Sequence, residues 1–157
     1  MTNIEDATKL AQSMIDTAEG LGVQTRAMLS WMENPIGNMV GNALEIQESI
    51  EILKGVGPED SVFITAKLGA HLLEMTGIVQ SIEEGEAKIR STFTDGSALQ
   101  HFKVMLKNHR VHSNTIEKLC DDPTSVLPQA KHKTPIFPKQ DGYIRSIDGM
   151  GIAQLGL

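Results

Sequence analysis

The first part of the chain has the hydrophobic spacing of an amphipathic helix. Apolar residues recur three or four positions apart, at Ile4, Ala7, Leu10, Ala11, Met14, Ile15 and Ala18. Because an α-helix turns once in ~3.6 residues, this spacing gathers them on one face. Thr2-Asn3-Ile4-Glu5 has the form of a capping box, in which a hydroxyl and a carboxylate accept from free backbone N–H groups. We therefore predict a helix that begins at this box and is ended by Gly20 and Gly22.

Apolar and polar residues alternate over positions 23–30, and this alternation predicts a strand. A helix followed by a strand is half of the βαβ unit that builds parallel sheets. The strand that would precede the helix is missing from the sequence, so we expect further sequence upstream of Met1. Residues 142–147 alternate in the same way and predict a second strand.

Four longer helices and one short helix are predicted between these two strands. Their ranges are 42–53, 60–76, 82–93, 98–107 and 114–119. Asn42-Ala43-Leu44-Glu45 offers a capping box for the first of them, and Ser97 offers a cap for the fourth. Apolar residues cover nearly the whole circumference of the helix at 60–76, so we expect it to be buried on most sides.

Composition and charge restrict the class of protein. The chain has 157 residues and is 40% hydrophobic and 22% charged, which is typical of a globular protein. A formal net charge of -6 and an aromatic content of 4% argue against nucleic-acid binding. No apolar run approaches the ~18 residues of a membrane span, no secretory signal opens the chain, and the single cysteine suits a reducing compartment. We predict a cytoplasmic protein without nucleic-acid or membrane partners.

Few residues suggest catalytic chemistry. The sequence contains no P-loop, GxGxxG, GxSxG, HExxH or CxxC motif. His109 and His112 are spaced for one helical face and suggest either a metal pair or solvated histidines. His71 and Glu74 suggest either a catalytic dyad or a surface pair. Cys120 suggests a nucleophile or a structural cysteine at a helix end, and the acidic residues that follow it favour the structural reading. The residues alone therefore predict no active site.

One segment resembles a known family signature. Residues 35–48 read Pro-Ile-Gly-Asn-Met-Val-Gly-Asn-Ala-Leu-Glu-Ile-Gln-Glu, which resembles P-L-G-x-x-V-G-N-A-L-E-V-x-E of the thymidine phosphorylase (pyrimidine-nucleoside phosphorylase) family. Ile36 and Ile46 are the departures from it. Further matches follow in the family's order, at Gly57-Pro58, Leu68-Gly69, Asp95-Gly96-Ser97-Ala98-Leu99, Leu127-Pro128-Gln129-Ala130 and Asp141-Gly142-Tyr143-Ile144.

The resemblance implies an α/β fold and a homodimer. This chain would be the helix-rich later portion of the family's large α/β domain, with an incomplete parallel or mixed sheet and packed helices. Residues 1–122 would belong to that domain. Residues 123–140, which contain Pro123, Pro128, Pro135 and Pro138, would form a Pro-rich connection. Residues 141–157 would begin a C-terminal strand-rich segment.

The resemblance also implies an activity. The family cleaves thymidine or a related pyrimidine nucleoside with phosphate, a pentosyl transfer that yields the free base and deoxyribose 1-phosphate. The family's phosphate-binding motif, catalytic histidine and base-binding residues have no counterpart in this sequence. We therefore assign no catalytic or phosphate-binding residue and expect the chain alone to be inactive. A non-catalytic helical interaction module derived from the same fold is the alternative, and thymidine and uridine both stay open as substrates.

A structural cation is the one family site that the resemblance carries over. Its ligands here would be the backbone carbonyls of Ile36 and Met39 and the side chain of Glu48. Carbonyl oxygens suit a hard monovalent or divalent cation whatever side chains they belong to, so the departure at Ile36 matters little. The alternative is that Glu48 is an ordinary carboxylate on a helix surface.

Overall fold

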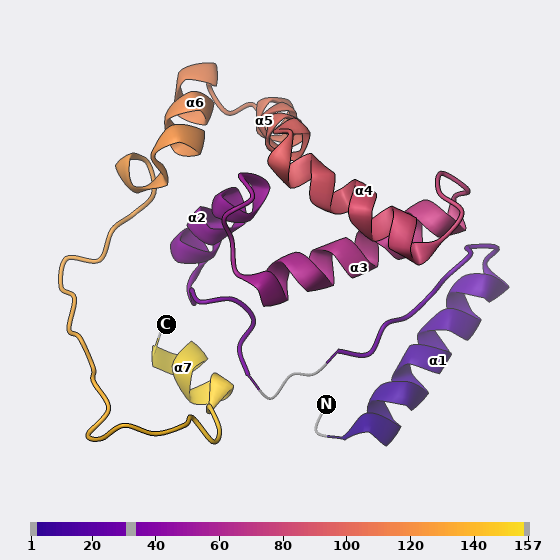
Figure 1. Cartoon of the computed structure of the whole chain (residues 1–157), viewed down its shortest axis with the longest axis horizontal. Helices are drawn as coiled ribbons and strands as arrows, with labels where there is room; N and C mark the ends of the chain where they lie inside the picture. Colours follow the sequence, from indigo (N-terminus) through magenta and orange to yellow (C-terminus); the bar gives the residue numbers. More distant parts are fainter. Residues whose placement is uncertain (1–2, 31–33, 156–157) are drawn as a thin grey trace.

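The structure is a computed structural model, and it describes residues 3–30 and 34–155. Within these residues the chain forms seven α-helices and one 3-10 helix, and it forms no strand (Figure 1). The helices are α1 (Ile4–Gly20), α2 (Asn42–Leu53), α3 (Glu59–Met75), α4 (Ile82–Thr94), α5 (Ser97–Asn108), α6 (Ser113–Asp121), η1 (Pro123–Ser125) and α7 (Gly149–Leu155). None of the described helices combines the length and the hydrophobicity needed to cross a membrane.

Helix α1 begins and ends close to its predicted bounds. Asn3 is the N-cap, and its side chain accepts a hydrogen bond from the Asp6 backbone N–H at 2.8 Å. The predicted cap, Thr2, lies outside the described residues. Gly22 follows the last turn with a φ of +79°, a conformation that glycine adopts without strain. The predicted helix over this part of the chain is therefore confirmed.

The caps of α2 and α5 differ by one residue from the predicted caps. Gly41 caps α2, and only the carboxylate part of the predicted box forms, because Glu45 accepts from the Gly41 N–H at 3.2 Å. Gly96 caps α5 with a φ of +79°. Ser97 is thus the first helical residue, and its N–H donates to the Asp95 carboxylate at 2.8 Å. The prediction of Ser97 as a cap is wrong because a single glycine both ends α4 and starts α5.

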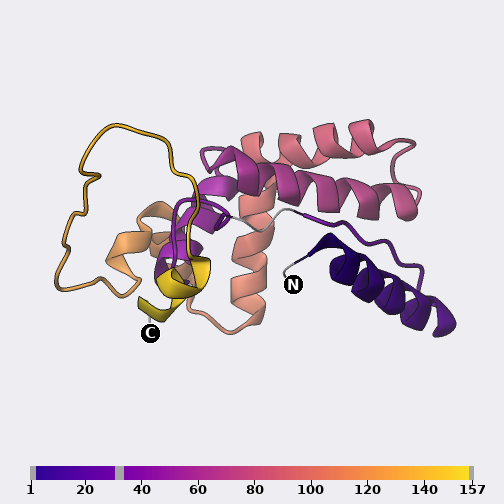
Figure 2. The ribbon, with the colours of Figure 1, turned by 90° about the horizontal axis from the view of Figure 1, so that it is seen from below.

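Helices α3 and α4 lie side by side and form the most extensive contact in the fold (Figure 2). Small residues let the two backbones approach closely. A Cβ added at Gly85 of α4 would lie 2.8 Å from the Ala70 Cα of α3, and one added at Gly69 would lie 2.8 Å from Ile89. Ion pairs between Lys67 and Glu86, and between other residues of the two helices, border this contact. The packing of α3 against α4 therefore depends on glycine, which has no side chain, as much as on the burial of apolar residues.

Only part of the surface of α3 is buried. The buried residues are Ser61, Val62, Ala66 and Ala70. Ala70 packs against Gly85 of α4, whereas the Ser61 hydroxyl lies beside Gly37 of the loop before α2. Phe63 is 46% exposed, Leu68 48% and Leu72 63%. The prediction that this helix is buried on most sides is therefore wrong for the chain as described. Beyond α3, the core is completed by residues of α2, α4 and α6, namely Ile50, Phe93, Ile116, Leu119 and Cys120.

The two predicted strands are not formed in the described chain. Residues 23–30 run as an extended segment from α1 toward α2, without β-ladder hydrogen bonds (Figure 1). Residues 142–147 are also irregular, and α7 follows them. A strand needs a neighbour that pairs with its N–H and C=O groups, and the described residues supply none. At both places the alternating pattern correctly predicted a segment that is not helical. It did not show which other segment would pair with it as a neighbouring strand.

The chain exposes far more surface than a compact monomer of its mass. Its accessible surface is 12247 Å². A folded monomer of 17.1 kDa exposes roughly 7,700 Å². Helix α1 and helix α7 contribute to the excess, because neither contains a buried residue. Much of the apolar surface of the chain is therefore left without a partner.

We predict that Gly85→Ala destabilises the protein although alanine is the better helix former. The substitution gains up to about 1 kcal/mol of helix propensity but forces α3 and α4 apart, which costs about 1–3 kcal/mol. Gly20→Ala is the matched control, because Gly20 also lies in a helix and has no atom within 4 Å of an added Cβ. Urea unfolding followed by circular dichroism should show a lower midpoint for Gly85→Ala alone. A Gly85→Ala protein as stable as Gly20→Ala would contradict the close packing.

Candidate functional site

The loop before α2 is held by carboxylates from two different helices. Glu48 of α2 is 7% exposed, and its Oε1 accepts a hydrogen bond from the Asn38 backbone N–H at 2.8 Å. Asp60, in the first turn of α3, accepts from the Gly37 N–H through Oδ2 at 2.9 Å. Two consecutive N–H groups of the loop thus point at two negative charges. These bonds join residues 34–41, α2 and α3 into one site.

Gly37 is required at the centre of this loop. Its φ is +71°, in the region that L-residues with a side chain rarely adopt. A Cβ on Gly37 would lie 2.1 Å from Glu48 Oε2 and 3.2 Å from Ser61 Oγ. The backbone therefore approaches the Glu48 carboxylate more closely than any other residue type would allow.

Electrostatics keep Asp60 ionised. The Gly37 N–H is the largest cause of a lowered pKa of the Asp60 carboxyl, and hydrogen bonds from the Ser61 N–H and hydroxyl lower it further. Partial desolvation acts in the opposite direction but is outweighed. Asp60 is therefore a carboxylate at neutral pH, and its Oδ1 accepts from Ser61 N at 2.7 Å.

The structure brings Glu48 to the loop that carries Ile36 and Met39. The carbonyl oxygens of Ile36 and Met39 accept no hydrogen bond from the described residues, and neither does Glu48 Oε2. Three oxygen donors suit a hard cation, although Ca²⁺ prefers about 6–8. Among the described residues no group of three or more His, Cys, Asp or Glu side chains could hold a metal by itself. The interpretation of Glu48 as an ordinary surface carboxylate is wrong, because Glu48 is buried under the loop.

His71 and Glu74 do not form a pair with each other. Both contact Arg26 of the extended segment, whose Nη1 lies 3.0 Å from His71 Nδ1 and 2.8 Å from Glu74 Oε2. Because a guanidinium only donates hydrogen bonds, His71 Nδ1 is the acceptor. This contact fastens residues 23–30 to α3 beside a cleft of about 360 Å³, and it supplies no nucleophile.

The remaining histidine and cysteine candidates have structural positions. His109 ends α5 and His112 precedes α6, with Arg110 between them at a φ of +63°. The spacing of the two histidines predicted that they share one helical face. This prediction is wrong, because they lie on either side of a turn between two helices. Cys120 is 1% exposed, and burial raises the pKa of its thiol. A buried thiol with a raised pKa is a poor nucleophile, which agrees with the structural interpretation of Cys120.

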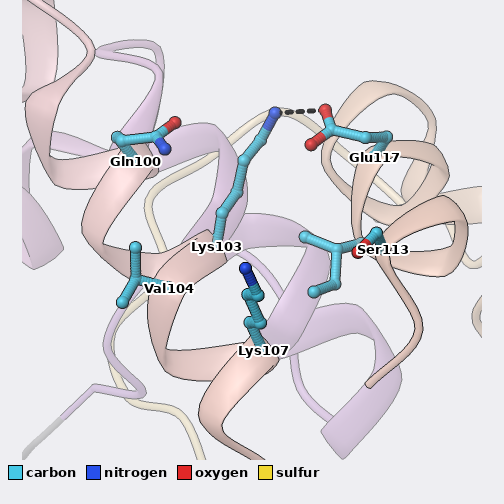
Figure 3. A pocket seen from close by; sticks show the side chains of 7 residues that line it. Gln100, Lys103, Val104, Lys107, Ser113 and Glu117 are labelled. Carbon is cyan, nitrogen blue, oxygen red and sulfur yellow. Dashed lines mark hydrogen bonds and ion pairs between the residues drawn. The ribbon is translucent and has the colours of Figure 1, made fainter. Parts of the chain in front are cut away.

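A second cleft, of about 230 Å³, separates α5 from α6 (Figure 3). Lys103 on its wall pairs with Glu117, and this bond raises the pKa of Lys103. Lys107 of α5 and Ser113 of α6 also line this cleft. None of the residues singled out from the sequence lines this cleft.

Comparison with known proteins places the chain in a family. The family model described as "Glycosyl transferase family, a/b domain" matches residues 1–99, which is more than half of the chain. The chain therefore belongs to the glycosyl transferase family. The matched residues include the loop, Glu48 and Asp60, so the site described above lies within the family's α/β domain.

Curated members of the glycosyl transferase family resemble this chain along its whole length. It is 38% identical over 159 residues to the pyrimidine-nucleoside phosphorylase of Geobacillus stearothermophilus, 36% over 157 residues to that of Bacillus subtilis, and 33% over 159 residues to that of Staphylococcus aureus. The alignments cover 100%, 99% and 100% of this chain but 36%, 35% and 36% of the relatives. The chain thus spans about a third of their length, and the resemblance seen in the 35–48 signature is confirmed.

Asp60 is the residue of this loop site that the sequence pattern did not single out. An acidic residue in the first turn of a helix is common, because it complements the helix dipole. Its contact with Gly37 crosses 23 residues of sequence, and no local pattern reports such a contact. The only local signal was Gly57-Pro58, which places a helix start near Asp60.

We predict that Gly37→Ala destabilises the protein more than Gly77→Ala does. Both glycines have a φ of +71°, but an added Cβ meets nothing within 4 Å at Gly77. Each substitution loses about 1–2 kcal/mol to the left-handed backbone, and Gly37→Ala loses a further ~1–3 kcal/mol by displacing the Glu48 carboxylate. Equal losses in urea unfolding would show that the loop does not press against Glu48.

Proposed function

We propose that this chain forms part of a pyrimidine-nucleoside phosphorylase that acts on thymidine, in pyrimidine nucleoside salvage. The observation that carries the proposal is the signature at residues 35–48 within a chain 38% identical to a protein of that name. In the proposed reaction a phosphate oxygen bonds to C1′ of the nucleoside and the glycosidic C–N bond breaks. The base leaves with the electron pair of that bond and takes up a proton, and 2-deoxyribose 1-phosphate is the second product.

This chain contributes structure to the proposed enzyme and leaves the chemistry to other parts of it. The reaction develops oxocarbenium-like charge and needs a cradle of N–H groups and cations for the phosphate dianion. In the described structure the loop N–H groups of Gly37 and Asn38 already donate to the Asp60 and Glu48 carboxylates, so they are not free to bind phosphate, and the negative charge beside them disfavours an anion. We therefore assign no catalytic residue here and expect the chain alone to be inactive.

The proposed enzyme supplies the partners that this chain lacks. Residues 23–30 are extended and form no β-ladder within the described chain, and we infer that they join a parallel or mixed sheet with strands from the rest of the protein. The accessible surface of 12247 Å², far above that of a compact monomer, supports burial against further domain elements and against a second subunit in a homodimer. In this arrangement residues 1–122 belong to the α/β domain, 123–140 connect, and 141–157 begin the C-terminal segment.

A structural cation is part of the same proposal. The carbonyls of Ile36 and Met39 and the Glu48 carboxylate would hold it, with further oxygen ligands from other parts of the protein. When bound, the cation would neutralise the buried charge of Glu48 and fasten the loop to α2. The buried carboxylate, with Oε2 free of hydrogen bonds from the described residues, supports this assignment. The single free cysteine agrees with a cytoplasmic location.

A chimera tests the proposed function. Residues 1–157 replace the matching third of the Geobacillus stearothermophilus protein, and the release of thymine from thymidine is followed with and without phosphate. We expect phosphate-dependent release by the chimera and none by the 157-residue chain alone, because only the chimera contains the phosphate and base sites. Uridine is assayed as the second substrate, because release of the base from either nucleoside shows that this chain functions within the chimera.

Two results would contradict the proposal. Phosphorolysis by the isolated chain would place the catalytic residues within it. A folded chimera that cleaves neither thymidine nor uridine, while the unaltered Geobacillus protein cleaves one of them, would favour the alternative of a non-catalytic helical module.

A further inference from the structure

The peptide unit between Ile36 and Gly37 is held by one specific contact. Asp60 Oδ2 accepts from the Gly37 N–H at 2.9 Å, and no peptide bond in the described residues is cis. In a planar trans peptide the N–H and the C=O point in opposite directions. With its N–H directed at Asp60, this unit must therefore direct the Ile36 carbonyl away from Asp60.

We propose that Asp60 is a positioning residue that fixes the Ile36–Gly37 peptide and so aims the Ile36 carbonyl into the cation site. The inference rests on the cation site of the proposed function. It adds a residue of α3 to a site whose ligands lie in the loop and in α2. The loop contact of Asp60 is with a backbone N–H, so its proposed effect on the cation ligand passes through the backbone.

Asp60 is rigid enough for this role. Its second oxygen, Oδ1, accepts from the Ser61 N–H at 2.7 Å, and the Ser61 hydroxyl lies 3.4 Å away. Ser61 is itself buried, and its hydroxyl lies beside Gly37 of the loop. The carboxylate is thus fixed at one oxygen and free to hold the loop with the other.

Glu48 fixes the next peptide in the same way. Its Oε1 accepts from the Asn38 N–H, so the unit between Gly37 and Asn38 is also held. Two successive peptides are therefore oriented before any cation binds. A ligand loop that is already ordered loses less conformational entropy on binding, which strengthens the affinity.

Glu59 offers a matched control for the charge of Asp60. Both residues lie in the first turn of α3, where a negative charge stabilises the helix. Glu59 pairs with Arg90 at 2.7 Å, whereas the loop contact belongs to Asp60. A purely helical role of Asp60 would be reproduced by Glu59→Ala, and a positioning role would not.

Nuclear magnetic resonance of the 157-residue chain tests the positioning. In Asp60→Ala we expect the Gly37 amide to exchange with solvent about tenfold faster or more, since a hydrogen bond to a charged group is lost. The Ile36 carbonyl resonance should also move. Asp60→Asn, whose amide oxygen can still accept from Gly37, should restore both signals, and Glu59→Ala should leave both unchanged. If Asp60→Ala does not fold, Asp60→Ser carries the same test because its side chain is too short to reach the loop.

Two results would overturn the inference. One is an unchanged Gly37 exchange rate and Ile36 resonance in Asp60→Ala or Asp60→Ser. The other is an equal change in Glu59→Ala, which would show that the charge acts through the helix alone.

Calorimetric titration of the chimera with calcium chloride, and separately with potassium chloride, distinguishes this inference from the proposed cation site, because the chimera contains the ligands from other parts of the protein. Glu51 lies on α2 near Glu48 and accepts a hydrogen bond from the Gln47 side chain at 3.1 Å, so Glu51→Gln is the matched control for Glu48→Gln. We expect the chimera with the wild-type sequence and its Glu51→Gln variant to bind one of the two cations, Glu48→Gln to lose it, and Asp60→Ala to bind it about tenfold more weakly. Equal affinity in wild type and Asp60→Ala would overturn the positioning of a ligand. If wild type binds neither cation, the cation site is refuted. If Gly37 and Ile36 still respond to Asp60→Ala in that case, the hydrogen bond by which Asp60 orients the Ile36–Gly37 peptide is supported on its own.

Discussion

The close contact between α3 and α4 is the interaction on which the loop before α2 depends. It forms because Gly69 and Gly85 leave room for the facing helix, so that the two backbones meet around Ala70. This contact fixes the direction of α3 and thereby the place of its first turn. Asp60 and Ser61 project from that turn toward the loop before α2. The geometry of the loop thus depends on the packing of α3 against α4.

The loop is stabilised by hydrogen bonds from its backbone N–H groups to the carboxylates of Glu48 and Asp60. Burying a carboxylate such as Glu48 is unfavourable unless it is hydrogen-bonded or paired with a cation. The Asn38 N–H satisfies one oxygen, and the approach of Gly37 shields the other. A bound cation would complete this arrangement with the free carbonyls of Ile36 and Met39. The same residues thereby explain why the signature contains glycine at 37 and glutamate at 48.

Helices were the part of the fold that the sequence predicted well. The range 42–53 matches α2, and 82–93 matches α4 to one residue, because the spacing of apolar residues is a local property. Caps were displaced by one residue where glycine with a positive φ, as at Gly41 and Gly96, took the place of a side-chain cap. The strands predicted at 23–30 and 142–147 are not formed in the described chain, because a strand needs a neighbouring strand to pair with and a local sequence pattern does not identify that neighbour.

The candidate site was also predictable only where a local sequence pattern determines it. Glu48 was predictable from its place in the 35–48 signature, but its burial was not, since burial depends on how the loop folds over α2. Asp60 was not predictable at all, because its bond to Gly37 joins residues that are 23 positions apart. Residues of the signature therefore identify the family, and tertiary contacts identify how the site is held.

Anomalous X-ray scattering from crystals of the chimera, grown with rubidium chloride and separately with calcium chloride, tests most directly whether the loop before α2 holds a cation. We predict an anomalous peak with one of the two salts, bound by the Ile36 and Met39 carbonyls and by Glu48, with the Gly37 N–H bonded to Asp60. No peak at Glu48 with either salt would contradict the cation site, and an Ile36 carbonyl that points toward Asp60 would contradict its positioning.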